Sequence, residues 1–126
     1  MKIKLLPISL TEKQFAQQII DLCKLFGWRY YRTWLSVHSP AGFPDIVMVR
    51  PPRLIFAELK SEIGKLSPEQ EAWLDGLKEC QKTITFEPIV IRGEPLRGNF
   101  PLLTIPEVYL WRPNQFDEIV ELLKQK

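Results

Sequence analysis

The sequence predicts an α/β fold in which a central mixed sheet of about four strands is flanked by helices. Its 126 residues are a usual length for a chain that folds around a single hydrophobic core. Helical segments with capping signals alternate with short apolar segments of strand character. A hydrophobic content of 45% and a charged content of 25% exclude a disordered chain. We therefore expect a single domain over residues 1–126.

Capping signals define the ends of the expected helices. The first helix begins at a capping box whose N-cap is Thr11, and it ends at Gly27. The second begins at a capping box whose N-cap is Ser67, and it ends near Cys80. A third, amphipathic helix is expected over residues 114–124.

Four segments of strand character lie between these helices, over residues 28–34, 46–49, 54–57 and 108–111. The middle two form a hairpin, and their nearly continuous apolar residues predict burial on both faces of the sheet. Pro51 and Pro52 cannot supply the positive φ angles of a tight hairpin turn, so a wider loop is expected. Prolines and glycines break residues 81–106, which we interpret as an irregular insertion.

The rarer residues exclude several protein classes. A single histidine, His38, cannot build a His-rich zinc site, and a Ser/His/Asp triad would have to use it. Cys23 and Cys80 lack CxxC spacing, so we expect two buried, reduced thiols. Without a signal peptide or a long apolar run, the chain is expected to be cytoplasmic. The formal charge of +2 is too small to establish a polyanionic partner.

Two acids at the rim of the hairpin indicate a candidate catalytic site. A loop centred between Pro51 and Pro52 places Asp45 opposite Glu58 on one face, with Cβ atoms about 4.5–5.5 Å apart, and Lys60 projects from the same face. Because adjacent carboxylates repel, the arrangement favours a bound divalent cation such as Mg²⁺ or Mn²⁺, which could activate a nucleophile for phosphodiester hydrolysis. In the alternative interpretation, the acids are solvated strand ends and Lys60 is their ion-pair partner.

Four ordered blocks carry a resemblance to a known family. GFPDIV at residues 42–47 and ELKSE at 58–62 resemble the PD-(D/E)XK nuclease signature. Together with LSPEQEAWL at 66–74 and VYLWRP at 108–113, they are similar to its virus-type replication-repair nuclease (VRR-NUC) branch. The resemblance extends from about residue 11 to residue 123 and implies a restriction-endonuclease-like fold.

The resemblance also implies an activity, namely metal-dependent hydrolysis of DNA in replication, recombination or repair, in a phage or a cell. The implied substrates are branched DNAs such as flaps or Holliday junctions, and two copies of the chain would pair on a two-fold symmetric junction. Two other classes stay open: a nucleic-acid-binding module that keeps the fold without cutting, and a structural domain in which the acids have no chemical role.

Roles for single residues follow from the same resemblance. The implied metal ligands are Asp45, Glu58, the main-chain carbonyl of Leu59, and Glu12. Lys60 would orient or activate the attacking water. Glu12 would assist a second ion or position that water, or it is simply a first-turn acid favoured by the helix dipole. Gln70 would support Lys60 or contact the DNA backbone, although its capping box already gives it a structural role.

Basic residues beside aromatic ones are the candidates for DNA contact. They are Arg29, Arg32, Arg53 and Lys65, interleaved with Trp28, Tyr30, Tyr31 and Trp34. Alternatively, the aromatic residues belong to a half-buried strand. The chain departs from the family pattern in the long insertion and at Arg32, where relatives often carry histidine. His38 lies a few residues later, and we interpret it as a solvated loop residue with a lesser case for a role in the site.

Overall fold

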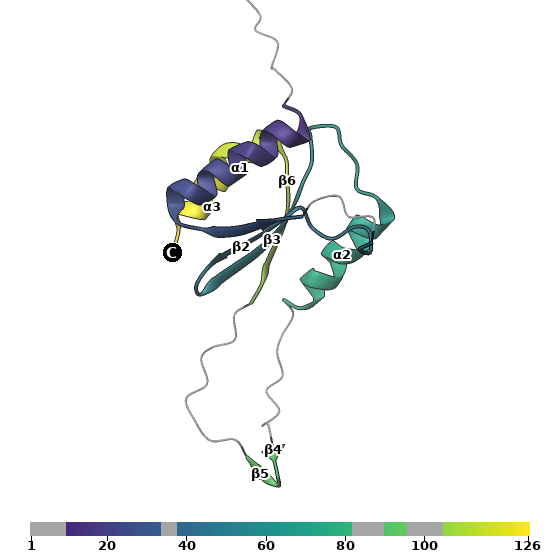
Figure 1. Ribbon diagram of the computed structural model, residues 1–126, viewed down its shortest axis with the longest axis vertical. Coiled ribbons are helices and arrows are strands. Elements are labelled where there is room, and N and C mark those ends of the chain that lie inside the picture. The colour runs from purple at the N-terminus through teal and green to yellow at the C-terminus, as the bar shows by residue number, and fades with distance from the viewer. Residues whose placement is uncertain (1–9, 34–37, 82–89, 96–104) are drawn as a thin grey trace, which may run out of the picture.

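A computed structural model describes residues 10–33, 38–81, 90–95 and 105–126 (Figure 1). Its centre is a four-stranded sheet with the strand order β1-β2-β3-β6. The strands are β1 (Arg29–Arg32), β2 (Ile46–Arg50), β3 (Arg53–Leu59) and β6 (Glu107–Trp111). The first three are antiparallel, and β6 is parallel to β3. This mixed sheet, flanked by helices, confirms the predicted fold class.

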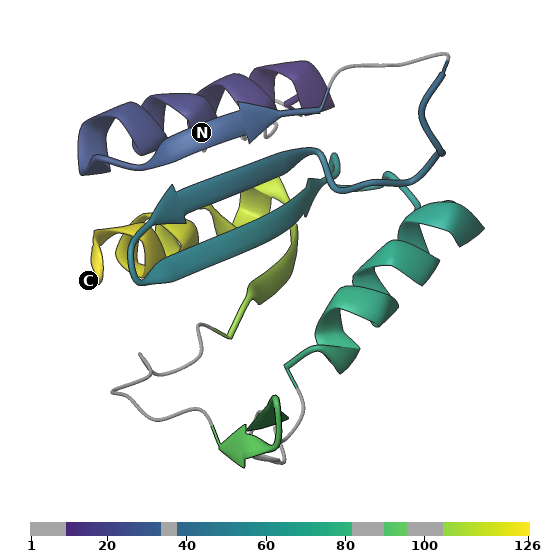
Figure 2. The ribbon, with the colours of Figure 1, turned by 60° about the horizontal axis from the view of Figure 1, so that its bottom comes forward.

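The helices lie on both sides of the sheet. They are α1 (Glu12–Phe26), α2 (Pro68–Glu79) and α3 (Phe116–Lys124), and a short 3₁₀ turn, η1 (Pro113–Gln115), precedes α3. Figures 1 and 2 show α1 and α3 side by side over one face, with α2 on the other side of the sheet. Thr11 and Ser67 each form the expected capping box, and Gly27 ends α1 with φ of 77°. No helix in the described ranges has the length and apolarity of a membrane span.

The hydrophobic core lies between the sheet and the α1–α3 pair. Phe15 and Ile19 of α1, with Ile119 and Leu123 of α3, pack on the strand residues that point to this side. The prediction that both faces are buried was wrong, because Val49 on the opposite face is 37% exposed. A helix is about 10 Å wide and strands are about 4.8 Å apart, so α2 alone covers only about half of a four-stranded face. We call the uncovered part, over β1 and β2, the open face.

The hairpin between β2 and β3 closes more tightly than expected. Arg50 pairs with Arg53, so only Pro51 and Pro52 form the connection, and the peptide bond between them is cis. The expectation of a wider loop was wrong because a turn with cis-proline at its third position needs no positive φ. The centre of the hairpin is nevertheless where the sequence placed it, and this fixes the register at the other end of the two strands.

An arginine cluster at this turn ties α3 to the hairpin. Arg53 forms a two-pronged ion pair with Glu107, at 2.7 and 2.8 Å, and donates to the carbonyl oxygen of Leu122 at 2.9 Å. Trp28 is buried beneath the guanidinium groups of Arg50 and Arg53, whose central carbons lie 4.6 and 5.0 Å from its ring centre. The structure thus gives Arg53 and Trp28 structural roles, and the DNA contacts considered from the sequence stay predictions.

The proline-rich segment and the two cysteines also carried sequence expectations. The region interpreted as an irregular insertion contains a small hairpin, β4 (Val90–Ile91) with β5 (Glu94–Pro95). Cys23 is buried as expected, and burial raises the pKa of its thiol to about 12. Cys80 is exposed, contrary to expectation, because it is the C-cap residue beyond the last turn of α2. The candidate Trp34 lies outside the described residues.

Candidate active site

The site begins where the hairpin ladder ends. The β2–β3 register, extended by one residue beyond Ile46 and Ala57, places Asp45 opposite Glu58. The backbone N–H of Thr33 donates to the carbonyl oxygen of Asp45 at 2.8 Å, so β1 supports this position. A carboxylate oxygen of Asp45 accepts from the backbone N–H of Leu59 at 2.8 Å. Asp45 is therefore held in the sheet with one oxygen already committed to the backbone.

The backbone of Leu59 faces the same side. Its neighbour Lys60 donates through its N–H to the carbonyl of Trp111 in β6, whereas the Leu59 N–H points to Asp45 in the opposite direction. The N–H and C=O of one strand residue project to the same edge, so the Leu59 carbonyl also faces Asp45. This is the orientation that the implied role of the carbonyl as a metal ligand requires.

Glu58 is the most unusual residue of the site. Its side chain is 1% exposed, and its Oε1 accepts from Nε2 of Gln70 at 3.0 Å. Its other oxygen, Oε2, is buried and has no hydrogen-bond partner among the described residues. Burial, followed by the effect of the neighbouring Asp45 carboxyl, raises the pKa of Glu58 to about 8, while Lys60 acts in the opposite direction. The site favours additional positive charge at this position.

Lys60 provides part of that charge. The residue is only 8% exposed, and its ammonium nitrogen lies 3.8 Å from Oε1 of Glu58. The same nitrogen lies 4.0 Å from Oε1 of Glu12, in the first turn of α1, whose side chain is 51% exposed. The ammonium thus lies between a buried and a solvent-facing carboxylate.

Gln70 performs two tasks with one side chain. Its Oε1 accepts from the backbone N–H of Ser67 at 2.9 Å, which closes the capping box of α2. Its Nε2 donates to the carboxylate of Glu58. The sequence interpretation had instead given Gln70 a role in supporting Lys60 or contacting the DNA backbone. The structural and functional interpretations of Gln70 are therefore compatible.

Arg112 and two glycines, which the sequence analysis did not assign, shape the loops around the site. Arg112 follows β6 and donates to the carbonyl oxygens of Ser61 and Gly64, at 2.6 and 2.7 Å, which holds the β3–α2 loop. A Cβ added to Gly64 would lie 3.2 Å from a carboxylate oxygen of Glu12, so the loop is close against the site. Gly42, with φ of 96°, packs on the backbone of α2. The only sequence signal was that Gly42 and Arg112 belong to the blocks GFPDIV and VYLWRP, and Gly64 lies in neither block.

The remaining candidates lie around the site without forming it. Arg29 is exposed at the end of β1 away from Asp45, whereas Arg32 is half-buried at the near end, opposite Ile46. Lys65 and His38 are exposed in loops. Arg53 lies at the far end of the hairpin, five rungs from Asp45 and Glu58, which is about 17 Å at strand spacing.

The donors present fit a hard divalent cation. No group of three or more His, Cys, Asp or Glu side chains within the described ranges is arranged to hold a metal ion, so the side-chain ligands number fewer than in a closed protein site. Two carboxylates with a main-chain carbonyl leave positions for water and phosphate oxygens, as Mg²⁺ sites commonly do. The unpartnered oxygen of Glu58 and its raised pKa are the observations that favour such an ion.

Comparison with known proteins agrees with this arrangement. The family model described as VRR-NUC domain matches residues 6–93, which is more than half of the chain and includes Glu12, Asp45, Glu58, Lys60 and Gln70. The match ends before β6 and α3. No curated protein and no solved structure shows detectable similarity to the chain. On the family match, this chain belongs to the VRR-NUC domain family of nucleases.

Proposed function

We propose that this protein is a divalent-metal-dependent DNA endonuclease of the PD-(D/E)XK type that cuts branched DNA. Membership of a nuclease family supplies the general activity. The observation that carries the metal-dependent form is the buried carboxylate of Glu58, opposite Asp45, with one oxygen unpartnered. A domain that only bound DNA would gain nothing from two facing acids beside a polyanion.

Asp45, Glu58 and the Leu59 carbonyl would hold the cation, with Glu12 near enough to Lys60 to assist from the solvent side. When bound, Mg²⁺ or Mn²⁺ supplies Lewis acidity toward a phosphate oxygen. The protein contributes rigid ligands, because the backbone holds Asp45 and Gln70 holds Glu58. Preorganisation of this kind removes the cost of arranging charges during the reaction.

Lys60 would orient the attacking water. Its ammonium donates hydrogen bonds only, so it directs the lone pair of a water molecule toward the phosphorus atom and stabilises negative charge on the phosphate. Glu58 and Glu12, on either side of the ammonium, restrict where it can point. Glu12, being half-exposed, can accept a proton from the water and pass it to solvent.

Branched DNA is the substrate class that we propose for this site. Arg29 is exposed on the open face beside the acids, and Lys65 is exposed in the β3–α2 loop. One active site cuts one strand, so symmetrical cutting of a junction requires two copies of the chain. We therefore propose a homodimer on Holliday junctions, and a single copy is sufficient for a flap.

The test is cleavage of labelled single-stranded, duplex, flap and four-way junction DNA in Mg²⁺, Mn²⁺ or EDTA. Asp45→Asn should abolish cutting, and Lys60→Met should reduce the rate about 100-fold or more. Asp117→Asn and Lys24→Met, exposed changes of the same kind on α3 and α1, should cut like wild type. DNA binding without cutting in any metal would refute the proposal and identify a binding module. Equal cutting of all four DNAs would refute the branched substrate.

A further inference from the structure

A row of aromatic residues runs from the open face across β3 to α2, next to the acids Asp45 and Glu58. Tyr31 of β1 pairs with Val47, and Val47 pairs with Phe56 of β3. The ring of Phe56 contacts Phe43 edge to face, with centroids 6.2 Å apart, and Phe43 contacts Trp73 of α2 in the same way at 5.1 Å. We call Tyr31, Phe56, Phe43 and Trp73 the aromatic row.

The orientation of Tyr31 follows from its neighbour. Tyr30 packs against the core beneath α1, and successive strand residues point to opposite faces, so Tyr31 points to the open face. Its side chain is 67% exposed, although it lies in the middle of a sheet strand. Among the described residues, Figure 2 shows no helix over β1 and β2 on the side away from α1 and α3. Packing among the described residues therefore does not account for an aromatic residue at this position.

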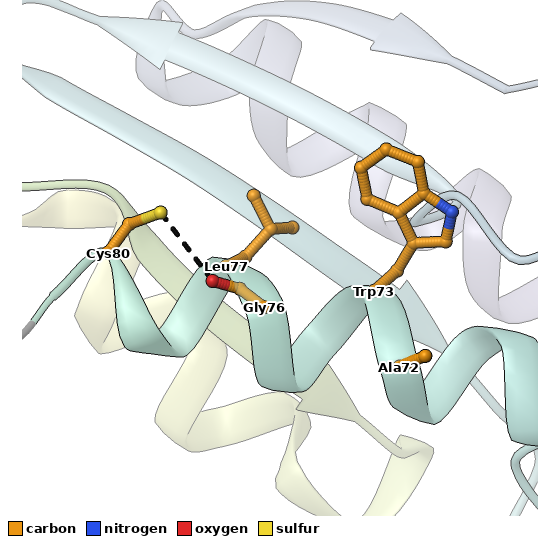
Figure 3. A pocket seen from close by; sticks show the side chains of 5 residues that line it. All are labelled: Ala72, Trp73, Gly76, Leu77 and Cys80. Carbon is orange, nitrogen blue, oxygen red and sulfur yellow. Dashed lines mark hydrogen bonds between the residues drawn. The ribbon is translucent and has the colours of Figure 1, made fainter.

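Trp73 forms the other exposed end of the row. It is 39% exposed on α2, and Leu77 and Cys80 continue from it along the same side of the helix. Figure 3 shows Trp73 and Leu77 both projecting from α2 toward the strands, where they line a shallow apolar pocket with Ala72, Gly76 and Cys80. The row thus presents aromatic surface on both sides of the sheet–helix junction.

The aromatic row lies two rungs from the candidate active site. The Tyr31–Val47–Phe56 rung is two residues from the Asp45–Glu58 rung along each strand, on the same face. Diagonal neighbours of this kind have Cα atoms about 7–8 Å apart, which is close to the spacing of consecutive phosphates along a DNA strand. Arg29, two residues from Tyr31 on the same face, is exposed and adds positive charge there.

We propose that Tyr31 and Trp73 stack unpaired bases of the strand that is cut. The inference rests on the proposed nuclease function and specifies its substrate: the scissile phosphate adjoins a single-stranded segment. Aromatic side chains bind unpaired bases of any sequence by stacking, whereas bases in a duplex are already stacked on one another. The catalytic acids next to the row handle a polyanion, and a protein docked on this face would block their approach. The nucleotide chain is therefore the occupant that the location favours.

The experiment measures binding without cleavage. In an Asp45→Asn protein with EDTA, the probes are a labelled thymidine oligomer, the same backbone without bases, and a duplex. Tyr31→Ala should weaken binding of the thymidine oligomer about fivefold to hundredfold, the loss expected for one stacked base. Tyr31→Phe should retain the affinity, since the ring is kept. Leu25→Ala, at a 71% exposed residue of α1, is the matched control and should bind like the parent protein.

Each outcome decides the inference. Trp73→Phe with near-parent affinity and Trp73→Ala with reduced affinity for the thymidine oligomer alone would support it. Equal affinity for the oligomer with and without bases, or an unchanged affinity in Tyr31→Ala, would overturn it. Sedimentation of the same variants tests a second copy as the occupant: a dimer that Tyr31→Ala dissociates without losing DNA affinity would also overturn it. Because binding is measured without cutting, a protein that proves not to be a nuclease can still pass or fail this test.

Discussion

Replacing Glu58 by glutamine should make the metal-free protein more stable above neutral pH. Burial and Asp45 raise the pKa of Glu58 to about 8, from an ordinary value of 4.5. Between these two values the folded state binds a proton that the unfolded state has lost, so the free energy of unfolding falls as the pH rises. Glutamine has nearly the same shape, carries no charge, and can donate its amide to the carboxylate of Asp45.

The size of the effect follows from the pKa. Each tenfold change in a proton equilibrium corresponds to about 1.4 kcal/mol. Because Glu58 is 1% exposed, solvent screens its charge little. Ionising it in the fold should cost on the order of 4 kcal/mol at pH 8 and under ~1 kcal/mol at pH 5. The expected loss between pH 5 and pH 8 is therefore roughly 3 kcal/mol, a large part of a typical domain's stability.

Urea unfolding in EDTA at pH 5 and pH 8 measures this directly. Wild type should lose stability across this range, Glu58→Gln should not, and the exposed change Glu118→Gln should follow wild type. Mn²⁺ at about 100 times its dissociation constant should restore about 3 kcal/mol to wild type at pH 8 and nothing to Glu58→Gln. A constant stability difference between wild type and Glu58→Gln at both pH values would refute the reasoning, because the buried carboxyl would then not be titrating abnormally.

Three further changes test the parts that support the site. Gly42→Ala should lower the free energy of unfolding by about 2–4 kcal/mol, since its Cβ would lie 2.5 Å from the backbone of α2. In the control Gly76→Ala, within α2, the added Cβ meets no atom within 4 Å, so the change should be neutral or stabilising. Gln14→Ala breaks only a capping box and should cost ~1 kcal/mol. Gln70→Ala should cost more, because it also removes the hydrogen bond to buried Glu58, and it alone should slow DNA cleavage. Arg53→Met should destabilise the fold by about 3 kcal/mol in urea unfolding and leave the cleavage rate of folded protein unchanged.

Local sequence rules predicted the elements that depend on near neighbours. Both capping boxes involve residues three apart, and the glycine that ends α1 needs only its own φ angle. The register of Asp45 against Glu58 was also accessible, because the two prolines fix the centre of a short hairpin. In these cases the sequence separation between interacting groups is small, so few alternative partners compete.

The features that the sequence did not predict depend on distant parts of the chain. Trp28 was a candidate DNA contact, and its burial requires α3, whose Leu123 carbonyl accepts from the Trp28 indole at 2.9 Å. Arg53 resembled a free basic residue because its partner, Glu107, is 54 residues away. The exposure of the open face could not be predicted for a similar reason. The apolar sequence of a strand does not reveal whether one helix or two cover that face of the sheet.

Glu12 and Gln70 show why sequence alone could not separate structure from function at this site. One is the first residue of α1 and the other is in the first turn of α2, where an acid or a glutamine already stabilises a helix. Both helices direct these first turns at the same buried carboxylate and ammonium, as the hydrogen bond from Gln70 to Glu58 and the approach of Glu12 to Lys60 show. The positive ends of two helix dipoles therefore offset part of the negative charge that Asp45 and Glu58 concentrate there. A residue that stabilises its helix end and also orients a catalytic group satisfies both requirements at once, so the capping pattern cannot reveal the second role.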